Sequence, residues 1–203
     1  MKIICVGRNY GDHIKELNNE RPESPVIFLK PDSSVLDKDK DFYLPDFSNE
    51  IHHEVEIIFK IGKIGKNIQA NFAHKYISEI GLGIDFTARD IQTNLKSKGL
   101  PWEISKGFDN SALIGKFKTF NYTQYQNGIH FSLENQEGFL QRGYSKEMIW
   151  GIEELIEYIS RYFTLKVGDI IFSGTPAGVS KVNINDQLIG KMEGEEFFNI
   201  KIK

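Results

Sequence analysis

The chain has 203 residues, a length typical of one domain that can bury a core without disulfides or a structural metal. Its 25 basic and 28 acidic residues give a net charge of −3, with no basic stripe, so electrostatics argues against a nucleic-acid partner. The single cysteine excludes a disulfide framework and any sulfur-based metal site. Any bound metal must therefore have oxygen or histidine ligands.

The N-terminal segment of the chain is apolar over only a few residues before Gly7. A secretory signal needs an apolar core of about 7–15 residues and a transmembrane helix needs about 20. We therefore expect a cytoplasmic protein with no membrane partner.

Strand patterns dominate the rest of the sequence. Short apolar or alternating runs bounded by Gly and Pro predict strands over residues 2–6, 26–29, 51–61, 80–86 and 170–173. Two hairpins are expected, one pairing residues 129–134 with 138–142 and the other pairing residues 187–192 with 196–202. Cys5 lies in the first strand and is expected to be a packing residue.

Helical patterns are fewer. The strongest covers residues 146–163, with apolar side chains on one face and Ser145 as its N-cap. A second covers residues 87–98 with Thr87 as its cap, and a weaker one covers residues 70–76. Because strands outweigh helices and no linker or repeat is present, we predict one α+β domain over residues 1–203.

Two carboxylates in the strand over residues 51–61 are the first candidate site. The strand period of two puts Glu54 and Glu56 on one face, with Val55 and Ile57 on the other. Neighbouring carboxylates repel each other unless a cation lies between them, and oxygen ligands suit Mg²⁺, Mn²⁺ or Ca²⁺. The alternatives are a solvated strand face or pairing with Lys or Arg. Asp85, at the end of a buried strand, is either a third ligand or an ordinary turn residue.

Two short helical segments carry polar pairs at a spacing of three residues. His13 and Glu16 share one side of a helical turn, so the carboxylate can orient the imidazole as a general base. Arg89 and Gln92 likewise share a helical face next to the end of the strand that carries Asp85. The alternatives are an incidental surface His–Glu pair and a salt bridge between Arg89 and Asp85.

Two loops complete the set of candidates. Trp102 and Lys106 lie in a Gly- and Pro-containing segment that is able to line a pocket for an anion, or to provide a packed Trp and a solvated Lys. Thr175 lies in a Gly-Thr-Pro-x-Gly turn whose amides are able to hold a carboxylate. The alternative for Thr175 is a tight structural turn.

Taken together and in order, these segments resemble the fumarylacetoacetate hydrolase family, in its short single-domain branch of acylpyruvate hydrolases and oxaloacetate decarboxylases. The resemblance extends from residue 7 to residue 178. It rests on Gly7-Arg-Asn-Tyr10 with His13 and Glu16, Phe28-Leu-Lys-Pro31, His52-His-Glu-Val-Glu56, Asp85-Phe-Thr-Ala-Arg-Asp-Ile-Gln92, Lys98-Gly-Leu-Pro-Trp102 with Lys106, and Gly168-Asp-Ile-Ile with Gly174-Thr-Pro-Ala-Gly178.

The resemblance implies a mixed β-sandwich roll with a few peripheral helices, usually a homodimer, that binds Mg²⁺ or Mn²⁺, with Ca²⁺ as a non-native occupant. It assigns the metal to Glu54, Glu56 and Asp85. It assigns catalysis to the His13–Glu16 dyad, in a segment that folds as a lid, and to Lys106, which stabilises an enolate. It assigns substrate binding to Arg8, Tyr10, Arg89, Gln92 and Thr175.

The implied activity is that of a metal-dependent hydrolase or lyase acting on 2-oxo acids through a metal-bound enolate. Such an enzyme cleaves the C–C bond of acylpyruvates such as acetylpyruvate or fumarylpyruvate, decarboxylates oxaloacetate, or does both. Two alternatives stay open. One is an isomerase, tautomerase or decarboxylase of a dicarboxylic dienol such as 2-hydroxyhepta-2,4-diene-1,7-dioate, and the other is a non-catalytic dicarboxylate-binding module.

Overall fold

The computed structural model of the chain describes residues 1–17 and 20–203. Its secondary structure is strand-dominated α+β, which confirms the predicted fold class. No helix in the described residues is long and apolar enough to span a membrane.

The main sheet is mixed. Strands β1 and β11 run parallel, as do β3 and β8, whereas the other neighbouring pairs are antiparallel. In the described residues its order is β2 (Val26–Lys30), β1 (Ile3–Gly7), β11 (Ile170–Phe172), β5 (Val55–Ile61), β6 (Ile77–Asp85), β8 (Ala112–Thr119) and β3 (Val35–Asp37).

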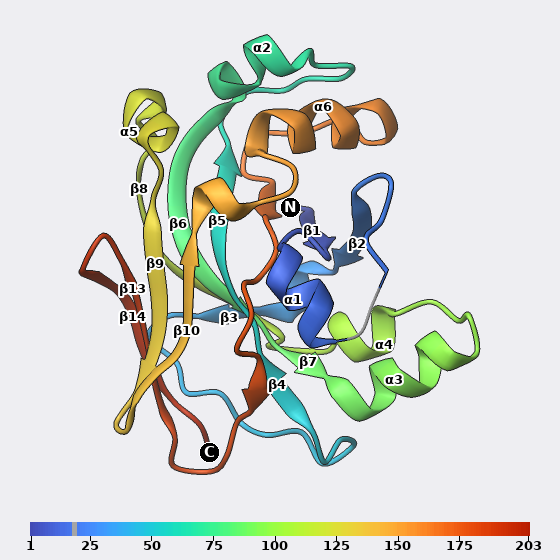
Figure 1. The fold of residues 1–203 in the computed structure, drawn as a ribbon, viewed down its shortest axis with the longest axis vertical. Coiled ribbons are helices and arrows are strands. Elements are labelled where there is room, and N and C mark those ends of the chain that lie inside the picture. The colour runs from blue at the N-terminus through green and yellow to red at the C-terminus, as the bar shows by residue number, and fades with distance from the viewer. Residues whose placement is uncertain (18–19) are drawn as a thin grey trace.

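A second sheet packs against the main one, and a small third sheet extends below it (Figure 1). The second has the order β10 (Gly138–Tyr144), β9 (His130–Asn135), β13 (Gln187–Met192) and β14 (Glu195–Lys201), which confirms both predicted hairpins. The third consists of β12 (Ser180–Lys181), β4 (Ile51–His53) and β7 (Thr87–Ala88).

The two larger sheets share one apolar core, in which Phe131 and Phe198 of the second sheet join Ile57 and Phe59 of β5. The alternate side chains of β5 face the other way, and Ile58 there packs with Cys5 in a smaller cluster. Cys5 is fully buried, as expected for a packing residue. The alternation of β5 therefore places Glu56 on the face opposite the main core.

The helices lie at the periphery of the sheets, as expected (Figure 1). Helix α2 and the following 3₁₀ turn η2 together cover the predicted helix over residues 70–76. The helical elements are α1 (Gly11–Glu16), η1 (Asp32–Ser34), α2 (Ala70–Ala73), η2 (His74–Tyr76), α3 (Arg89–Ser97), α4 (Glu103–Lys106), α5 (Tyr122–Asn127), η3 (Ser145–Glu147) and α6 (Ile152–Tyr162).

The prediction of one continuous strand over residues 51–61 was wrong, because the chain changes sheets at Glu54. Strand β4 pairs with β7 and β12, whereas β5 pairs with β6 and β11. At the break, the Glu54 carbonyl accepts a hydrogen bond from the Asp85 amide at 2.8 Å. The break thus joins the two chain segments that carry carboxylates.

The predicted helix over residues 87–98 begins later than expected. Thr87 and Ala88 form strand β7 opposite Ile51 and His52, so α3 starts at Arg89. The Thr87 hydroxyl donates to the Asp85 carbonyl at 3.3 Å instead of capping the helix. Pairing with β4 therefore prevails over the local capping preference of Thr87.

The predicted helix over residues 146–163 is also shorter than expected. Ser145 begins the short turn η3, and α6 starts only after Gly151, whose amide donates to the Glu154 carboxylate at 2.9 Å. Between these elements, Asn9 binds both polar groups of the Trp150 backbone, at 3.0 and 2.9 Å. These contacts hold the segment extended and oppose a continuous helix.

Candidate active site

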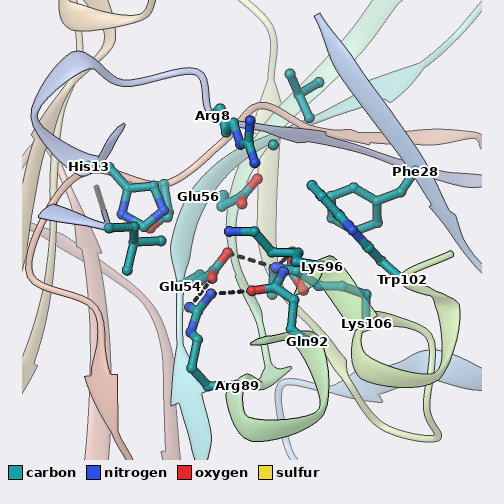
Figure 2. A pocket seen from close by; sticks show the side chains of 15 residues that line it. Arg8, His13, Phe28, Glu54, Glu56, Arg89, Gln92, Lys96, Trp102 and Lys106 are labelled. Atoms are coloured by element: carbon teal, nitrogen blue, oxygen red, sulfur yellow. Dashed lines mark hydrogen bonds and ion pairs between the residues drawn. The ribbon is translucent and has the colours of Figure 1, made fainter. Parts of the chain in front are cut away.

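Three carboxylates meet where β5, β6 and the break before β5 come together. Each of Glu54, Glu56 and Asp85 offers an oxygen atom that lies within 4.8 Å of the others, and all three side chains are buried. Glu56 and Glu54 project into a common pocket in Figure 2. The strand period brought Glu54 and Glu56 together as predicted, and the pairing of β5 with β6 added Asp85.

The electrostatics of this triad favour a bound cation. Burial raises the pKa of the Glu56 carboxyl well above its usual value, and the nearby charges of Asp85 and Glu54 raise it further. The Gly174 amide, 2.7 Å from Glu56 Oε2, opposes this shift only in part. Three buried carboxylate oxygens at this spacing are the donor set that hard divalent cations prefer, so the residues fit a divalent metal.

Lys106 is a cation that contacts two of these carboxylates. From α4, its buried ammonium lies 2.8 Å from Glu54 Oε2 and 2.7 Å from Asp85 Oδ2. Burial by itself lowers the pKa of Lys106, but the charges of Asp85 and Glu54 outweigh burial and raise it. Lys106 is therefore a buried group whose charged form is favoured by these two carboxylates, and the alternative of a solvated lysine is excluded.

Lys30 is a second buried cation at the triad, and sequence reasoning assigned it no role. Its ammonium lies 2.7 Å from Asp85 Oδ1 and donates to Ser111 Oγ at 2.9 Å. The signal in the sequence was a lysine at the end of an apolar strand, because such a lysine is rarely buried without an acidic partner. Lys30 and Lys106 together hold both oxygens of Asp85.

Arg89 and Gln92 point into the same pocket from α3 (Figure 2). The Arg89 guanidinium pairs with Glu54, whereas the sequence alternative paired it with Asp85. It also donates to Gln92 Oε1 at 2.6 Å. This bond occupies the amide oxygen of Gln92, so the Gln92 NH₂ group is the part of the amide that is able to donate to another partner. Burial would raise the pKa of Glu54, but Lys106 and Arg89 hold it below its usual range.

His13 lines the pocket from α1 (Figure 2). Its Nδ1 lies 3.1 Å from Glu16 Oε2, and the other Glu16 oxygen accepts the Gly178 amide at 2.9 Å. With Nδ1 donating to Glu16, the Nε2 atom is an acceptor. Burial lowers the pKa of His13 from 6.5, although Glu54 and Glu16 act in the opposite direction. The imidazole is therefore neutral at neutral pH.

Thr175 lines the pocket beside the triad, but its hydroxyl is already engaged. Thr175 Oγ1 donates to the Val55 carbonyl at 2.9 Å and accepts from Gln141 Nε2 at 2.8 Å. A hydroxyl carries one proton, so a carboxylate contact from Thr175 would have to use its backbone N–H. Its assignment to a substrate carboxylate stays a prediction.

The structure does not bring Tyr10 to the pocket. Its ring is buried in the main core and packs edge-on against Phe131, with ring centroids 6.4 Å apart. Arg8 does line the pocket, with its guanidinium 6.0 Å from the centre of the Trp102 ring. Trp102 also lines it, as the pocket interpretation of its loop predicted.

Lys96 is a pocket residue that sequence reasoning missed. It lies four residues after Gln92 and seven after Arg89, so all three share one face of α3. Figure 2 shows its side chain extending toward Glu54 and Glu56. The sequence signal for Lys96 was its helical spacing, because it lies one turn beyond the Arg89–Gln92 pair on the same face.

A comparison with known families matches residues 2–199 to the model for the C-terminal domain of fumarylacetoacetate hydrolase. The chain belongs to the fumarylacetoacetate hydrolase family. The match covers nearly the whole chain, including every residue of the pocket, and it confirms the resemblance seen in the sequence motifs.

Relatives within this family have several activities. The oxaloacetate tautomerase FAHD1, mitochondrial, of Mus musculus is 35% identical over 99% of this chain and 91% of its own length. The mitochondrial oxaloacetate decarboxylase of Dictyostelium discoideum is 42% identical over 89% of this chain and 84% of its own. Fumarylpyruvate hydrolase from Pseudomonas aeruginosa, solved in complex with Mn²⁺ and pyruvate, has a TM-score of 0.94 and 31% identity, covering 100% of this chain and 89% of that one.

Proposed function

We propose that this protein is a divalent-metal-dependent enzyme that forms and consumes the enolate of a 2-oxo acid. The observation that carries the proposal is the buried triad of Glu54, Glu56 and Asp85, with Lys106 and His13 directed into the same pocket. The activities of the family relatives support it, because tautomerisation, decarboxylation and acylpyruvate hydrolysis all pass through such an enolate.

The triad would hold the metal, and Mg²⁺ and Mn²⁺ are the proposed ions because the ligands are carboxylate oxygens. When bound, a divalent cation supplies Lewis-acid stabilisation of negative charge on a 2-oxo acid. The Mn²⁺ in the Pseudomonas aeruginosa relative supports this choice.

The residues of the pocket supply the remaining chemistry. His13, held by Glu16, accepts a proton at Nε2, either from a water that attacks the distal carbonyl or from substrate carbon. The Lys106 ammonium stabilises the negative charge that develops on the enolate oxygen. The Gln92 NH₂ group, oriented by Arg89, donates to the substrate carboxylate.

Our first candidate reaction is hydrolysis of acylpyruvates or decarboxylation of oxaloacetate. The second candidate, keto–enol tautomerisation of oxaloacetate, is favoured by the FAHD1 relative and needs only proton transfer at the same pocket. An assay with Mg²⁺ or Mn²⁺ that compares acetylpyruvate, fumarylpyruvate, and the enol and keto forms of oxaloacetate separates them. If none of these substrates is converted with either metal, the proposed function is wrong.

The His13→Gln variant is expected to separate these reactions. Hydrolysis needs an activated water, so it should fall about 10²–10⁴-fold, whereas decarboxylation of oxaloacetate needs no water attack and should change much less. The measurement is kcat for acetylpyruvate and for oxaloacetate in both proteins. His74→Gln, a change away from the pocket, is the matched control. Equal losses on both substrates would show that His13 does not activate water.

Hydrolysis is also expected to decrease in acid. The pKa of His13 lies below 6.5, so protonation removes its Nε2 lone pair only below that pH. Nearby positive charge from a bound metal would lower the pKa of His13 further, so the decrease in activity would occur at a more acidic pH. A pH profile of kcat for acetylpyruvate should show the acid limb in the natural protein, and the residual activity of His13→Gln should lack it. A limb that persists in the variant would assign it to another group.

Residues 1–203 are proposed to act as one catalytic domain, which the extent of the family match supports. The homodimer stays a prediction, and light scattering of the purified chain tests it.

A further inference from the structure

Gln141, in β10, is a buried amide with no part in the proposed chemistry. Only 1% of its surface is exposed, and it follows directly on Leu140, where the register of β10 against β9 shifts. Its side chain leaves the second sheet and contacts two segments that carry pocket residues. One is the break between β4 and β5, and the other is the turn over residues 174–178 after β11. A buried amide of this kind needs a partner for each of its polar atoms.

The partners of Gln141 determine which end of its amide is oxygen. The Val55 N–H is able only to donate and lies 3.0 Å from Gln141 Oε1, whereas the Pro176 carbonyl is able only to accept and lies 2.9 Å from Nε2. With this orientation fixed, His53 Nδ1 donates to Oε1 and Nε2 donates to Thr175 Oγ1, both at 2.8 Å. All four hydrogen-bonding positions of the amide are therefore occupied.

The same orientation fixes the hydroxyl of Thr175. Because Thr175 Oγ1 accepts from Gln141, its own proton is donated to the Val55 carbonyl at 2.9 Å. The side chain of Thr175 is thus held from two sides while the residue lines the pocket. A contact between Thr175 and a substrate carboxylate would use its backbone N–H, and the direction of that N–H depends on how the turn is held.

The turn over residues 174–178 connects two parts of the pocket. At its start, the Gly174 amide donates to Glu56 of the carboxylate triad at 2.7 Å. At its end, the Gly178 amide donates to Glu16, the partner of His13, at 2.9 Å. A shift of this turn would therefore disturb the general base and the carboxylate triad together.

The turn packs directly against β10. Gly178 has a φ of 100°, and a Cβ there would lie 2.5 Å from the Leu140 carbonyl, so this close approach requires glycine. The next residue of β10 is Gln141, which binds the middle of the turn at Thr175 and Pro176. Gln141 therefore provides the polar contact by which β10 fixes the middle of the turn.

We propose that Gln141 is a positioning residue that acts through Thr175, holding the Thr175 N–H toward the carboxylate of a bound 2-oxo acid. This inference rests on the proposed function and adds a residue that supports substrate binding. The carboxylate triad has further support of its own, because β5 pairs with β6 and the Asp85 amide donates to the Glu54 carbonyl. Loss of Gln141 should therefore affect substrate binding more than metal binding.

Binding of Mn²⁺ and of oxalate to the full chain tests this proposal without turnover. Oxalate is the probe because it presents a carboxylate beside a second oxygen, as a 2-oxo acid does. With saturating Mn²⁺, calorimetry should show oxalate binding about tenfold weaker in Gln141→Met, the effect of losing one well-placed hydrogen bond to a charged group. Affinity for Mn²⁺ alone should stay within about twofold. A purely structural role would lower thermal stability and leave the oxalate affinity of the folded protein unchanged.

Gln187→Met is the matched control. It makes the same change in β13 of the same sheet, at an amide that binds Asn199 and lies away from the pocket. Both affinities should remain those of the natural protein.

A double-mutant cycle shows whether Gln141 acts through Thr175. Thr175→Val removes the hydroxyl that Gln141 binds and should weaken oxalate binding about as much as Gln141→Met, whereas Thr175→Ser keeps the hydroxyl and should bind oxalate normally. The double variant Gln141→Met/Thr175→Val should lose little more than either single variant. Additive losses, or unchanged oxalate affinity in Gln141→Met, would overturn the proposal. If Gln141→Met does not fold, unchanged affinity in Thr175→Val overturns it instead.

These measurements distinguish this proposal from the proposed function. A natural protein that binds Mn²⁺ and oxalate, combined with additive losses in the cycle, refutes only the role of Gln141. The expected cycle, combined with no turnover of any 2-oxo acid tested, refutes only the proposed function. A natural protein that does not bind oxalate in the presence of Mn²⁺ refutes both.

Discussion

Replacing Glu56 with Gln is expected to weaken Mn²⁺ binding by at least about a hundredfold and to abolish metal-dependent turnover. The change removes one of three carboxylate ligands and one negative charge while keeping the shape of the side chain. The Gln oxygen is still able to accept the Gly174 amide. Because the variant also removes repulsion between Glu56 and its two carboxylate neighbours, it should be at least as stable as the natural protein without metal.

Calorimetric titration with Mn²⁺ and thermal unfolding of the metal-free proteins measure both effects. Glu79→Gln is the matched control, since it makes the same chemical change in an ion pair with Lys60 on the partly exposed part of β6. It should leave Mn²⁺ affinity unchanged. Unaltered Mn²⁺ affinity in Glu56→Gln would refute the assignment of this carboxylate to the metal.

Replacing Lys106 with Met is expected to affect both catalysis and stability. Turnover should fall about 10²–10³-fold, because the ammonium is the donor positioned for the enolate charge. The metal-free variant should also lose about 3–5 kcal/mol of unfolding free energy, because Glu54 and Asp85 each lose a buried partner. Mn²⁺ should restore much of that stability in the variant, since a divalent cation compensates the same carboxylates.

Urea unfolding with and without Mn²⁺, combined with kcat for oxaloacetate, checks these expectations. Lys118→Met is the control, because this lysine pairs with Glu195 on the protein surface and surface pairs contribute little to stability. If Mn²⁺ stabilises the Lys106 variant no more than the natural protein, then Lys106 and the metal do not act on the same carboxylates.

Local patterns predicted the parts of the site that lie on one element. The alternation of residues 54–57 placed Glu54 and Glu56 together, and Val55 and Ile57 entered the main core as expected. The i, i+3 spacing likewise paired His13 with Glu16 and Arg89 with Gln92. These relations follow from the periods of strands and helices, so they need no knowledge of the rest of the chain.

Relations between distant segments were harder to predict. Strands β3 and β8 and helices α4 and α5 were not predicted, and Tyr10 lies in the core although its motif pointed to the substrate. The breaks at Glu54 and before Gly151 depend on contacts with Asp85 and Asn9, which are far away in sequence. No local preference of the residues at those breaks specifies such partners.

By itself, the sequence determined a strand-dominated chain whose candidate metal ligands are oxygens, with three carboxylates, one His–Glu pair and no sulfur ligand. Only the tertiary structure decided how the cations are distributed around them. Lys30 and Lys106 each contact one oxygen of Asp85, Arg89 pairs with Glu54, and Arg8 and Lys96 line the same pocket. The physical reason is that charges act through space at short range, and only the packing of distant elements sets those distances.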